Sequence, residues 1–330
     1  PMMGWGGFRM IASALHTPPV ASSSVEPDPS CPVCGSDCFR PIAPVRTAYR
    51  RAVLGAAWDA GEEFSVSSCE GCGHLAIRPV PTPEFLDLFY RSYMDAASRG
   101  FYRAHFEDER EVGPHVMRAR SRATALARRS KGGRLLDVGC GPGVFLRVAR
   151  QAGFEVFGVE PHAETAEVAH RRTGARMCIA PIERADWDDA SFDVVTMWDV
   201  IEHLRDPRDA VARASRWVRP GGWLGLETPD AGSLLHRLAR GIFRTTGGRV
   251  TKPMSIYDVH HLHYFGGEGL RRLLAEHGFV VDGVWRESTA LDQYADPPYG
   301  RGVQLGLKGV FLLAELLGWQ NKQIVFARRR

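Results

Sequence analysis

The amino-acid sequence predicts an α/β protein: a mainly parallel β-sheet with helices on both faces, preceded by a small cysteine-rich module. From Leu135 onward, short apolar runs typical of strands alternate with amphipathic helical stretches, which is the order of elements in a doubly wound sheet. Near the start, residues 31–35 and 69–73 repeat one Cys-x-x-Cys-Gly pattern. With 330 residues, 44% of them hydrophobic, the chain can bury a substantial core.

The first 30 residues are rich in Pro, Ser and Ala and show no useful periodicity. We expect residues 1–30 to be a disordered leader. No basic region followed by a sustained apolar core marks a signal peptide, and the apolar run at residues 310–317 is too short to span a membrane. The expected location is therefore cytoplasmic.

Residues 31–80 are expected to form a zinc-binding module. Each Cys-x-x-Cys-Gly turn directs two thiolates towards one point, so Cys31, Cys34, Cys69 and Cys72 together offer four ligands to a structural Zn²⁺. The long segment between the two turns predicts a β-hairpin excursion. Four reduced cysteines without a metal, or an iron–sulfur cluster, are the alternatives.

Residues 81–133 read as a linker followed by a largely helical stretch. The dense apolar stripe that begins at Phe85 predicts either a helix packed on the core or a lid over a cofactor, to which Tyr90 or Tyr93 would contribute. The basic run at residues 118–134 is more typical of a solvated helix face than of an RNA-binding surface.

The most informative segment is residues 135–143, Leu-Leu-Asp-Val-Gly-Cys-Gly-Pro-Gly. It predicts a strand, a tight loop with Gly139, Gly141 and Gly143, and the start of a helix, where free backbone N–H groups can meet a ligand. The loop lacks the G-x-G-x-x-G fingerprint and the P-loop Gly-Lys-Ser/Thr signature. Asp137 beside it would repel a pyrophosphate but attract a cationic amino group. Glu160, at the tip of the next strand, suits a pair of ribose hydroxyls.

The remaining pattern completes the predicted sheet and adds two helical inserts. The inserts, at residues 231–250 and 300–318, would form part of a substrate pocket or a dimer interface. Strands are predicted at residues 134–138, 155–159, 176–179, 192–197, 223–228, 279–286 and 322–328.

This ordered set of motifs resembles class I S-adenosylmethionine (SAM) methyltransferases. The glycine loop resembles their motif I and Val159-Glu160-Pro161 their motif II, and the similarity continues through Trp198-Asp199 and the turn at residues 218–222 to the end of the chain. The resemblance covers roughly residues 80–330. It implies a Rossmann-like seven-stranded methyltransferase sheet over residues 134–330, with the seventh strand antiparallel.

The resemblance also implies roles for individual residues. Asp137, Gly139, Gly141 and Gly143 would line the methionine end of SAM, and Glu160 would bind its ribose. Ile182 and Glu183 lie where adenine contacts usually occur, and Trp198 and Asp199 would face the other side of the cofactor. His203 and His261, at the rim of the predicted cleft, are the candidate catalytic bases or substrate-orienting groups.

The function expected from the sequence is SAM-dependent methyl transfer to a small molecule or glycan, with oxygen as the favoured acceptor. A sugar C-methyltransferase, an RNA methyltransferase with a zinc module, and a non-catalytic scaffold are the alternatives. The net charge of +4 is too modest to favour nucleic acid as a partner, and no membrane partner is expected. Monomer and homodimer both stay open.

Overall fold

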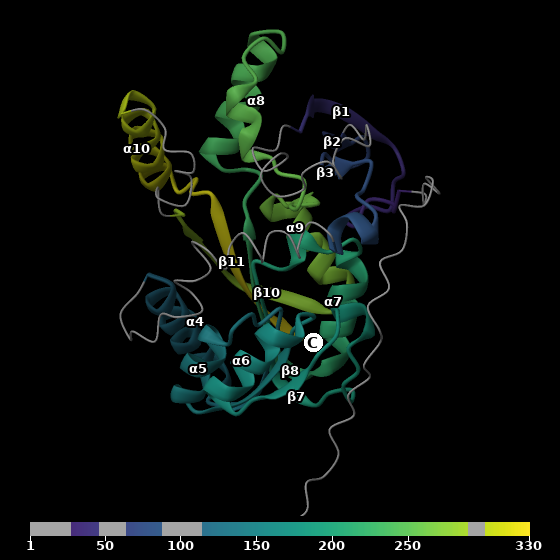
Figure 1. Ribbon diagram of the computed structural model, residues 1–330, viewed down its shortest axis with the longest axis vertical. Helices are drawn as coiled ribbons and strands as arrows, with labels where there is room; N and C mark the ends of the chain where they lie inside the picture. Colours follow the sequence, from purple (N-terminus) through teal and green to yellow (C-terminus); the bar gives the residue numbers. More distant parts are fainter. Residues whose placement is uncertain (1–27, 46–63, 88–113, 290–300) are drawn as a thin grey trace, which may run out of the picture.

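The computed structural model describes residues 28–45, 64–87, 114–289 and 301–330 (Figure 1). The predicted leader therefore lies outside the described residues up to position 27, and so do Tyr90 and Tyr93. Within the described part of the chain, no helix combines the length and the apolar character that crossing a membrane requires.

A seven-stranded sheet forms the centre of the molecule, in the order β10-β11-β8-β7-β4-β5-β6. β4 to β8 pair in parallel, whereas β11 is antiparallel to both β8 and β10. The predicted Rossmann-like sheet with one reversed strand is therefore confirmed. The strands are β4 (Gly133–Val138), β5 (Phe154–Val159), β6 (Arg176–Cys178), β7 (Phe192–Trp198), β8 (Val218–Pro229), β10 (Phe279–Glu287) and β11 (Lys322–Arg329).

Helices cover both faces of this sheet and enclose two separate apolar clusters. α4 (Pro114–Ser130), α5 (Val144–Gln151) and α6 (Ala163–Thr173) contribute to the cluster on one face. α7 (Pro207–Trp217) and α9 (Gly267–Glu276) contribute to the cluster on the other. Both predicted inserts are helical: α8 (Leu234–Thr245) and α10 (Arg301–Leu317) project beyond the sheet at the top of Figure 1.

The strand order creates one topological switch point, between β4 and β7. The chain winds outward from β4 through β5 and β6, then returns to β7 and winds the other way. The loops that follow β4 and β7 therefore separate to opposite faces, and the crevice between them is where doubly wound proteins bind ligands. The predicted glycine loop follows β4, and Asp199 follows β7.

The cysteine module is joined to the large domain by a shared sheet. β1 (Phe39–Pro44), β2 (Ser65–Cys69) and β3 (Leu75–Arg78) form an antiparallel sheet whose fourth strand is β9 (His263–Tyr264), from the large domain. Pairing of β1 with β2 agrees with the predicted hairpin excursion.

The module also shares the main core of the protein. Cys31, Val33 and Cys69 belong to the same buried cluster as Leu270 and Phe279 of the large domain. Across the junction, His74 and His263 are hydrogen-bonded through Nε2 and Nδ1 at 3.1 Å, and both rings are buried. The module and the large domain are therefore expected to unfold together.

We predict that Val33→Asp destabilises the whole protein by roughly 3 kcal/mol or more, because it buries an unpaired carboxylate in the shared core. Val250→Asp is the control, since Val250 is 42% exposed and surface changes usually cost less than about 0.5 kcal/mol. Thermal and denaturant unfolding would show one shifted transition. A separate early transition that alone responds to Val33→Asp would show that the module folds independently.

Candidate cofactor and active site

The glycine loop after β4 is held closely on two sides. Gly143 has φ +80° and a Cβ on it would lie 3.0 Å from Cα and Cβ of Ala169 in α6. A Cβ on Gly139 would lie 2.7 Å from Cγ2 of Val200, in the loop after β7. Neither glycine therefore has room for a side chain, and at Gly139 the loop packs directly against the segment that follows β7.

Glu160, directly after β5, is hydrogen-bonded to the glycine loop. Its carboxylate accepts hydrogen bonds from the backbone N–H of Gly141, at 3.1 Å, and of His162, at 3.0 Å. Burial raises the pKa of Glu160, although these two hydrogen bonds oppose the rise. The carboxylate is thus fixed beside the glycine backbone, and each oxygen keeps a second lone pair for a ligand hydroxyl.

Asp137, the last but one residue of β4, is buried beneath the loop. The Thr196 hydroxyl on the adjacent strand β7 donates to its Oδ1 at 2.6 Å, as expected from their paired register. Burial raises the pKa of Asp137 to about 7, against the lowering effect of the Thr196 hydrogen bond and the Arg122 guanidinium. A carboxyl group so poised favours a cationic ligand, which would stabilise its ionised form.

Trp198, the last residue of β7, and Asp199, which follows the strand, lie in different environments. The Trp198 ring packs edge-on against Phe145, with ring centroids 5.2 Å apart, and lies below the Arg122 guanidinium. It therefore contributes to packing, and its contact with a cofactor stays a prediction. Asp199 has φ +54° and both of its carboxylate oxygens accept hydrogen bonds from Lys322 Nζ, at 2.7 and 2.6 Å.

A buried charge network supports this end of the sheet, and the sequence did not reveal it. Glu227 on β8 is 1% exposed and pairs with Lys322 at 3.0 Å and with Arg122 of α4. Arg122 was expected on a solvated helix face. Its partner lies far away in the sequence, so no local pattern could have predicted the pairing.

Ile182 and Glu183 lie in a short 3₁₀ helix, Ile182–Arg184, that follows β6. The Ile182 side chain is buried in the main core, whereas Glu183 is exposed. The structure thus places both residues on the β6 side of the glycine loop, and their adenine contacts stay a prediction.

His203 and His261, the predicted acceptor-side residues, lie side by side. Their ring centroids are 4.7 Å apart, and His260 lies 5.4 Å from His203 and 4.4 Å from His261. The 3₁₀ helix Ile201–His203 follows Val200 directly, so His203 is one short turn along the chain from the residue that packs on Gly139. His203 Nδ1 is 2.8 Å from the carbonyl oxygen of His260, which orients the ring.

The surroundings of His203 and His261 favour the neutral form of these two rings. Burial, followed by the neighbouring His260, lowers the pKa of His203 to about 4, and burial also lowers that of His261. Glu202 is completely buried beside them, and burial together with Asp199 raises its pKa to about 8. Neutral imidazoles can accept a proton or a hydrogen bond from an acceptor molecule at physiological pH.

The four cysteines of the module converge as predicted. Their Sγ atoms all lie within 4.8 Å of one another; Cys31 is 3.6 Å from Cys72, and Cys34 is 3.4 Å from Cys69. The two turns have the same hydrogen bond. The N–H of Gly35 donates to the carbonyl oxygen of Cys31, and the N–H of Gly73 donates to the carbonyl oxygen of Cys69, both at 2.8 Å.

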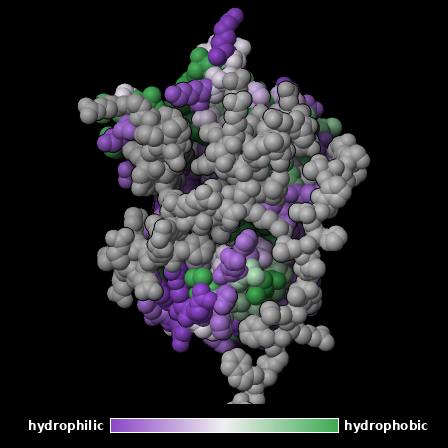
Figure 2. Space-filling view, viewed as in Figure 1, coloured by the Kyte–Doolittle hydropathy of each residue, from purple (hydrophilic) through white to green (hydrophobic). Residues whose placement is uncertain are grey.

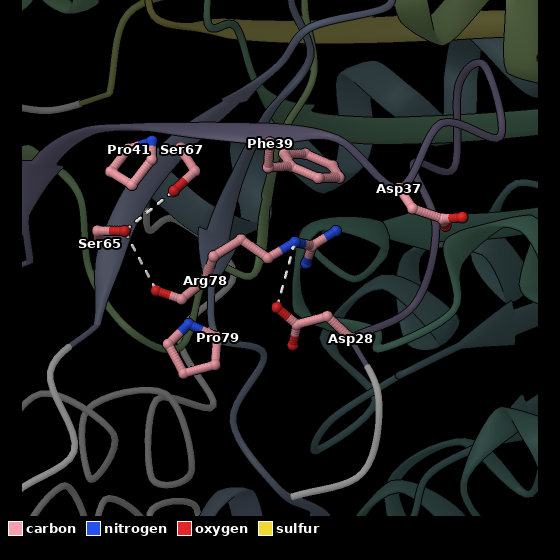
Figure 3. A pocket seen from close by; sticks show the side chains of 8 residues that line it. All are labelled: Asp28, Asp37, Phe39, Pro41, Ser65, Ser67, Arg78 and Pro79. Atoms are coloured by element: carbon pink, nitrogen blue, oxygen red, sulfur yellow. Dashed lines mark hydrogen bonds and ion pairs between the residues drawn. The ribbon is translucent and has the colours of Figure 1, made fainter.

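A pocket of about 330 Å³ lies in the module, away from the glycine loop (Figure 3). Arg78 occupies its centre: the guanidinium lies 4.0 Å above the Phe39 ring and 3.7 Å from Asp28. The positive charge of Arg78 is thus paired with Asp28 inside the pocket, which supports a structural role for Arg78.

With the site described, comparison with known proteins identifies the large domain. Residues 109–284, more than half of the chain, match the family model described as "Methyltransferase domain". The chain belongs to this methyltransferase family. The match includes the glycine loop, Glu160 and His203.

Curated relatives match part of this chain. A ubiquinone biosynthesis O-methyltransferase of Bordetella avium is 32% identical over 31% of this chain and 45% of its own length. That of Idiomarina loihiensis is 36% identical over 29% and 42%. An uncharacterized 37.1 kDa protein in transposon TN4556 of Streptomyces fradiae is 30% identical over 48% of each chain. The chain spans about half the length of the curated relatives it matches.

Solved structures resemble the methyltransferase at lower identity. A 1,6-didemethyltoxoflavin-N1-methyltransferase of Burkholderia thailandensis, solved with its acceptor and S-adenosylhomocysteine, is 16% identical, covers 82% of this chain and 96% of its own, and has a TM-score of 0.48. A SAM-dependent methyltransferase of Thermotoga maritima is 20% identical, covers 65% and 92%, and has a TM-score of 0.42.

We predict that Gly143→Ala destabilises the free protein by about 1–3 kcal/mol, since it adds a left-handed backbone penalty to a collision with Ala169. Gly153→Ala is the matched control: Gly153 has φ +94°, but a Cβ there meets nothing within 4 Å. Chemical denaturation would compare the two. Equal losses of stability would show that α6 does not confine the loop.

Proposed function

We propose that this protein is a SAM-dependent O-methyltransferase acting on a small-molecule or glycan acceptor. The observation that supports this most strongly is the pairing of two buried acids with a bare glycine backbone at the switch point. Asp137 provides negative potential for the cationic end of SAM, and Glu160 provides fixed acceptors for the two ribose hydroxyls. A pyrophosphate would be repelled by the same two carboxyl groups.

The protein's part in methyl transfer is mainly positioning. SAM supplies a methyl group already activated on a sulfonium, so the reaction is a one-step displacement in which the acceptor oxygen attacks the methyl carbon and the sulfur leaves as a neutral thioether. Holding the acceptor in line can contribute on the order of 7–11 kcal/mol. His203 lies on the short helix after Val200, which packs on the glycine loop, and the pair of His203 and His261 is suited to orient the acceptor hydroxyl and accept its proton.

Oxygen is favoured as the acceptor atom by this neutral histidine pair and by the curated relatives, several of which are named O-methyltransferases. A hydroxyl must lose its proton during transfer, and a neutral imidazole can take it. The relatives' names mention ubiquinone biosynthesis, so phenolic acceptors are the first to test.

We further infer that the four cysteines hold one structural Zn²⁺. Tetrahedral zinc with about 2.3 Å bonds to sulfur requires sulfur atoms about 3.8 Å apart, close to the 3.6 Å between Cys31 and Cys72 and the 3.4 Å between Cys34 and Cys69. A Cβ on Gly71 would lie only 3.1 Å from Cys34 Sγ. Glycine at position 71 therefore leaves space for the Cys34 thiolate. Cys31, Cys34, Cys69 and Cys72 would provide a closed site with no position open for catalysis.

Native mass spectrometry should find one zinc ion per chain. We expect Cys34→Ser combined with Cys69→Ser to abolish zinc binding and destabilise the protein, because metal binding at such sites is coupled to folding. Cys140→Ser is the control, as this thiol lies outside the cluster. Full stability in the double variant, or absorption bands of an iron–sulfur cluster in the wild type, would contradict the zinc site.

Methyl transfer itself is tested with isotope-labelled SAM and a panel of phenols, sugars and RNA. We expect labelled methyl on a hydroxyl of a small molecule.

Glu160→Ala should weaken SAM binding on the order of 100-fold, since it removes hydrogen bonds from two hydroxyls to a charged group. Glu167→Ala is its control because Glu167 is an exposed residue of α6 that pairs with Arg171 on the same helix.

Isothermal titration calorimetry measures these SAM affinities, and zinc content confirms that each variant is folded. Unchanged SAM affinity in Glu160→Ala would refute the ribose assignment. Label on carbon or on RNA would refute the proposed acceptor while leaving the cofactor site standing.

We predict that SAM affinity rises with pH. With its pKa near 7 in the free protein, Asp137 must lose a proton before it can attract the cation. Between pH 8 and pH 6 its ionised fraction falls about tenfold, so SAM affinity should fall by about the same factor. Asp137→Asn serves as the control and should bind weakly without this dependence. An affinity that is flat in the wild type over the same range would contradict the role of Asp137.

A further inference from the structure

The insert helix α10 is apolar on the side that it turns to solvent. Phe311 and Ala314 are buried against the protein, as expected for one face of a helix. Leu305, Leu312 and Leu316 lie on another face, spaced seven and four residues apart, and they are 68%, 61% and 76% exposed. A helix that is hydrophobic all round is normally covered on all sides, so this outer face needs a partner.

The second insert also exposes apolar side chains. Leu238 and Ile242 of α8, one turn apart, are each 40% exposed. The two inserts are joined, because the N–H of Leu234 donates to the carbonyl oxygen of Trp319 at 3.0 Å and Arg237 lies 5.0 Å above the Trp319 ring. We call residues 234–252 and 301–319 the α8–α10 projection. The projection lies at the top of Figure 2, where hydrophobic residues (green) and hydrophilic residues (purple) are mixed.

The charge of the projection is almost entirely positive. Its sequence contains a single acidic residue, Glu315. Arg240 is committed internally, to Tyr257 and the carbonyl oxygen of Ala231. Arg244, Arg249 and Lys308 are exposed. The full set of basic side chains that the structure describes here is Arg237, Arg240, Arg244, Arg249, Lys252 and Lys308.

We propose that the α8–α10 projection docks this enzyme on an anionic lipid bilayer. Exposed leucines flanked by arginine and lysine are the features by which a helix lies in a membrane interface, with its apolar face in the headgroup–acyl boundary and its cations at lipid phosphates. α10 has 17 residues, so it is about 25 Å long and lies along the surface rather than across the bilayer.

A second copy of the chain fits this surface less well. A two-fold interface places the same patch on both partners, so the cations of one projection would face those of the other, with only Glu315 of each chain to offset them. An anionic bilayer instead offers negative charge to each of the exposed cations Arg244, Arg249 and Lys308. The sequence-based expectation of no membrane partner considered only spanning segments, and interfacial docking needs none.

The test is flotation of the full-length protein with phosphatidylcholine vesicles that contain, or lack, about 30% phosphatidylglycerol. We expect binding to the anionic vesicles only, with marked release when NaCl is raised to about 0.5 M. Leu312→Glu combined with Leu316→Glu should reduce binding on the order of tenfold or more, and so should Arg244→Glu combined with Lys308→Glu. Met117→Glu, on α4, is the matched control because Met117 is 56% exposed outside the projection.

Circular dichroism and thermal unfolding would verify that each variant folds, and vesicle binding is read without any methyl transfer. No binding of the wild type to anionic vesicles would overturn the proposal. So would equal binding of the leucine variant, equal binding to vesicles without phosphatidylglycerol, or a dimer in light scattering that the leucine substitutions dissociate.

Discussion

The contact between the glycine loop and the segment after β7 is the constraint on which the rest of this site depends. Val200 lies so close to Gly139 that no side chain fits between them, and α6 confines the loop from the other side at Gly143. The loop therefore has no room for a side chain at Gly139 or at Gly143, and a ligand at the switch point can approach the backbone there. The two acids define what that ligand can be: Glu160 is locked to the loop by its hydrogen bonds, and Asp137 lies under it, half-way between charge states at neutral pH.

The same contact links the proposed cofactor site to the histidines proposed to face the acceptor. Val200 leads directly into the short helix that presents His203, and His203 is oriented by the carbonyl oxygen of His260. The histidine segment continues into β9, which completes the sheet of the cysteine module. A structural metal in that module would therefore stabilise the chain that holds the acceptor-side histidines, although it would take no part in the chemistry.

The sequence revealed much of the fold because its signals are local. Buried strands read as short apolar runs, so β4, β5 and β7 begin within one residue of the predicted positions and end within one residue of them. Matching Cys-x-x-Cys-Gly turns likewise predicted the convergence of four thiols. The strand β8 is longer than predicted, since Val218 already pairs with Phe192 before the glycine turn at residues 221–222.

What the sequence did not reveal depends on contacts between distant residues. The two residues of β9 form a strand only because β3 lies beside them. Arg122, Glu227 and Lys322 come from a helix and two strands and meet only in the folded protein. Glu202 is a buried acid with no periodic signal, and no local pattern indicates that the Trp198 ring packs against Phe145.

The most direct test of the central claim is a crystal structure of the protein soaked with S-adenosylhomocysteine, the product form of the proposed methyl donor. Our account predicts density in the crevice beyond β4, with the amino acid end of the ligand near Asp137 and its ribose hydroxyls on Glu160. An empty crevice at saturating ligand, or a phosphate-bearing nucleotide bound there in its place, would contradict it.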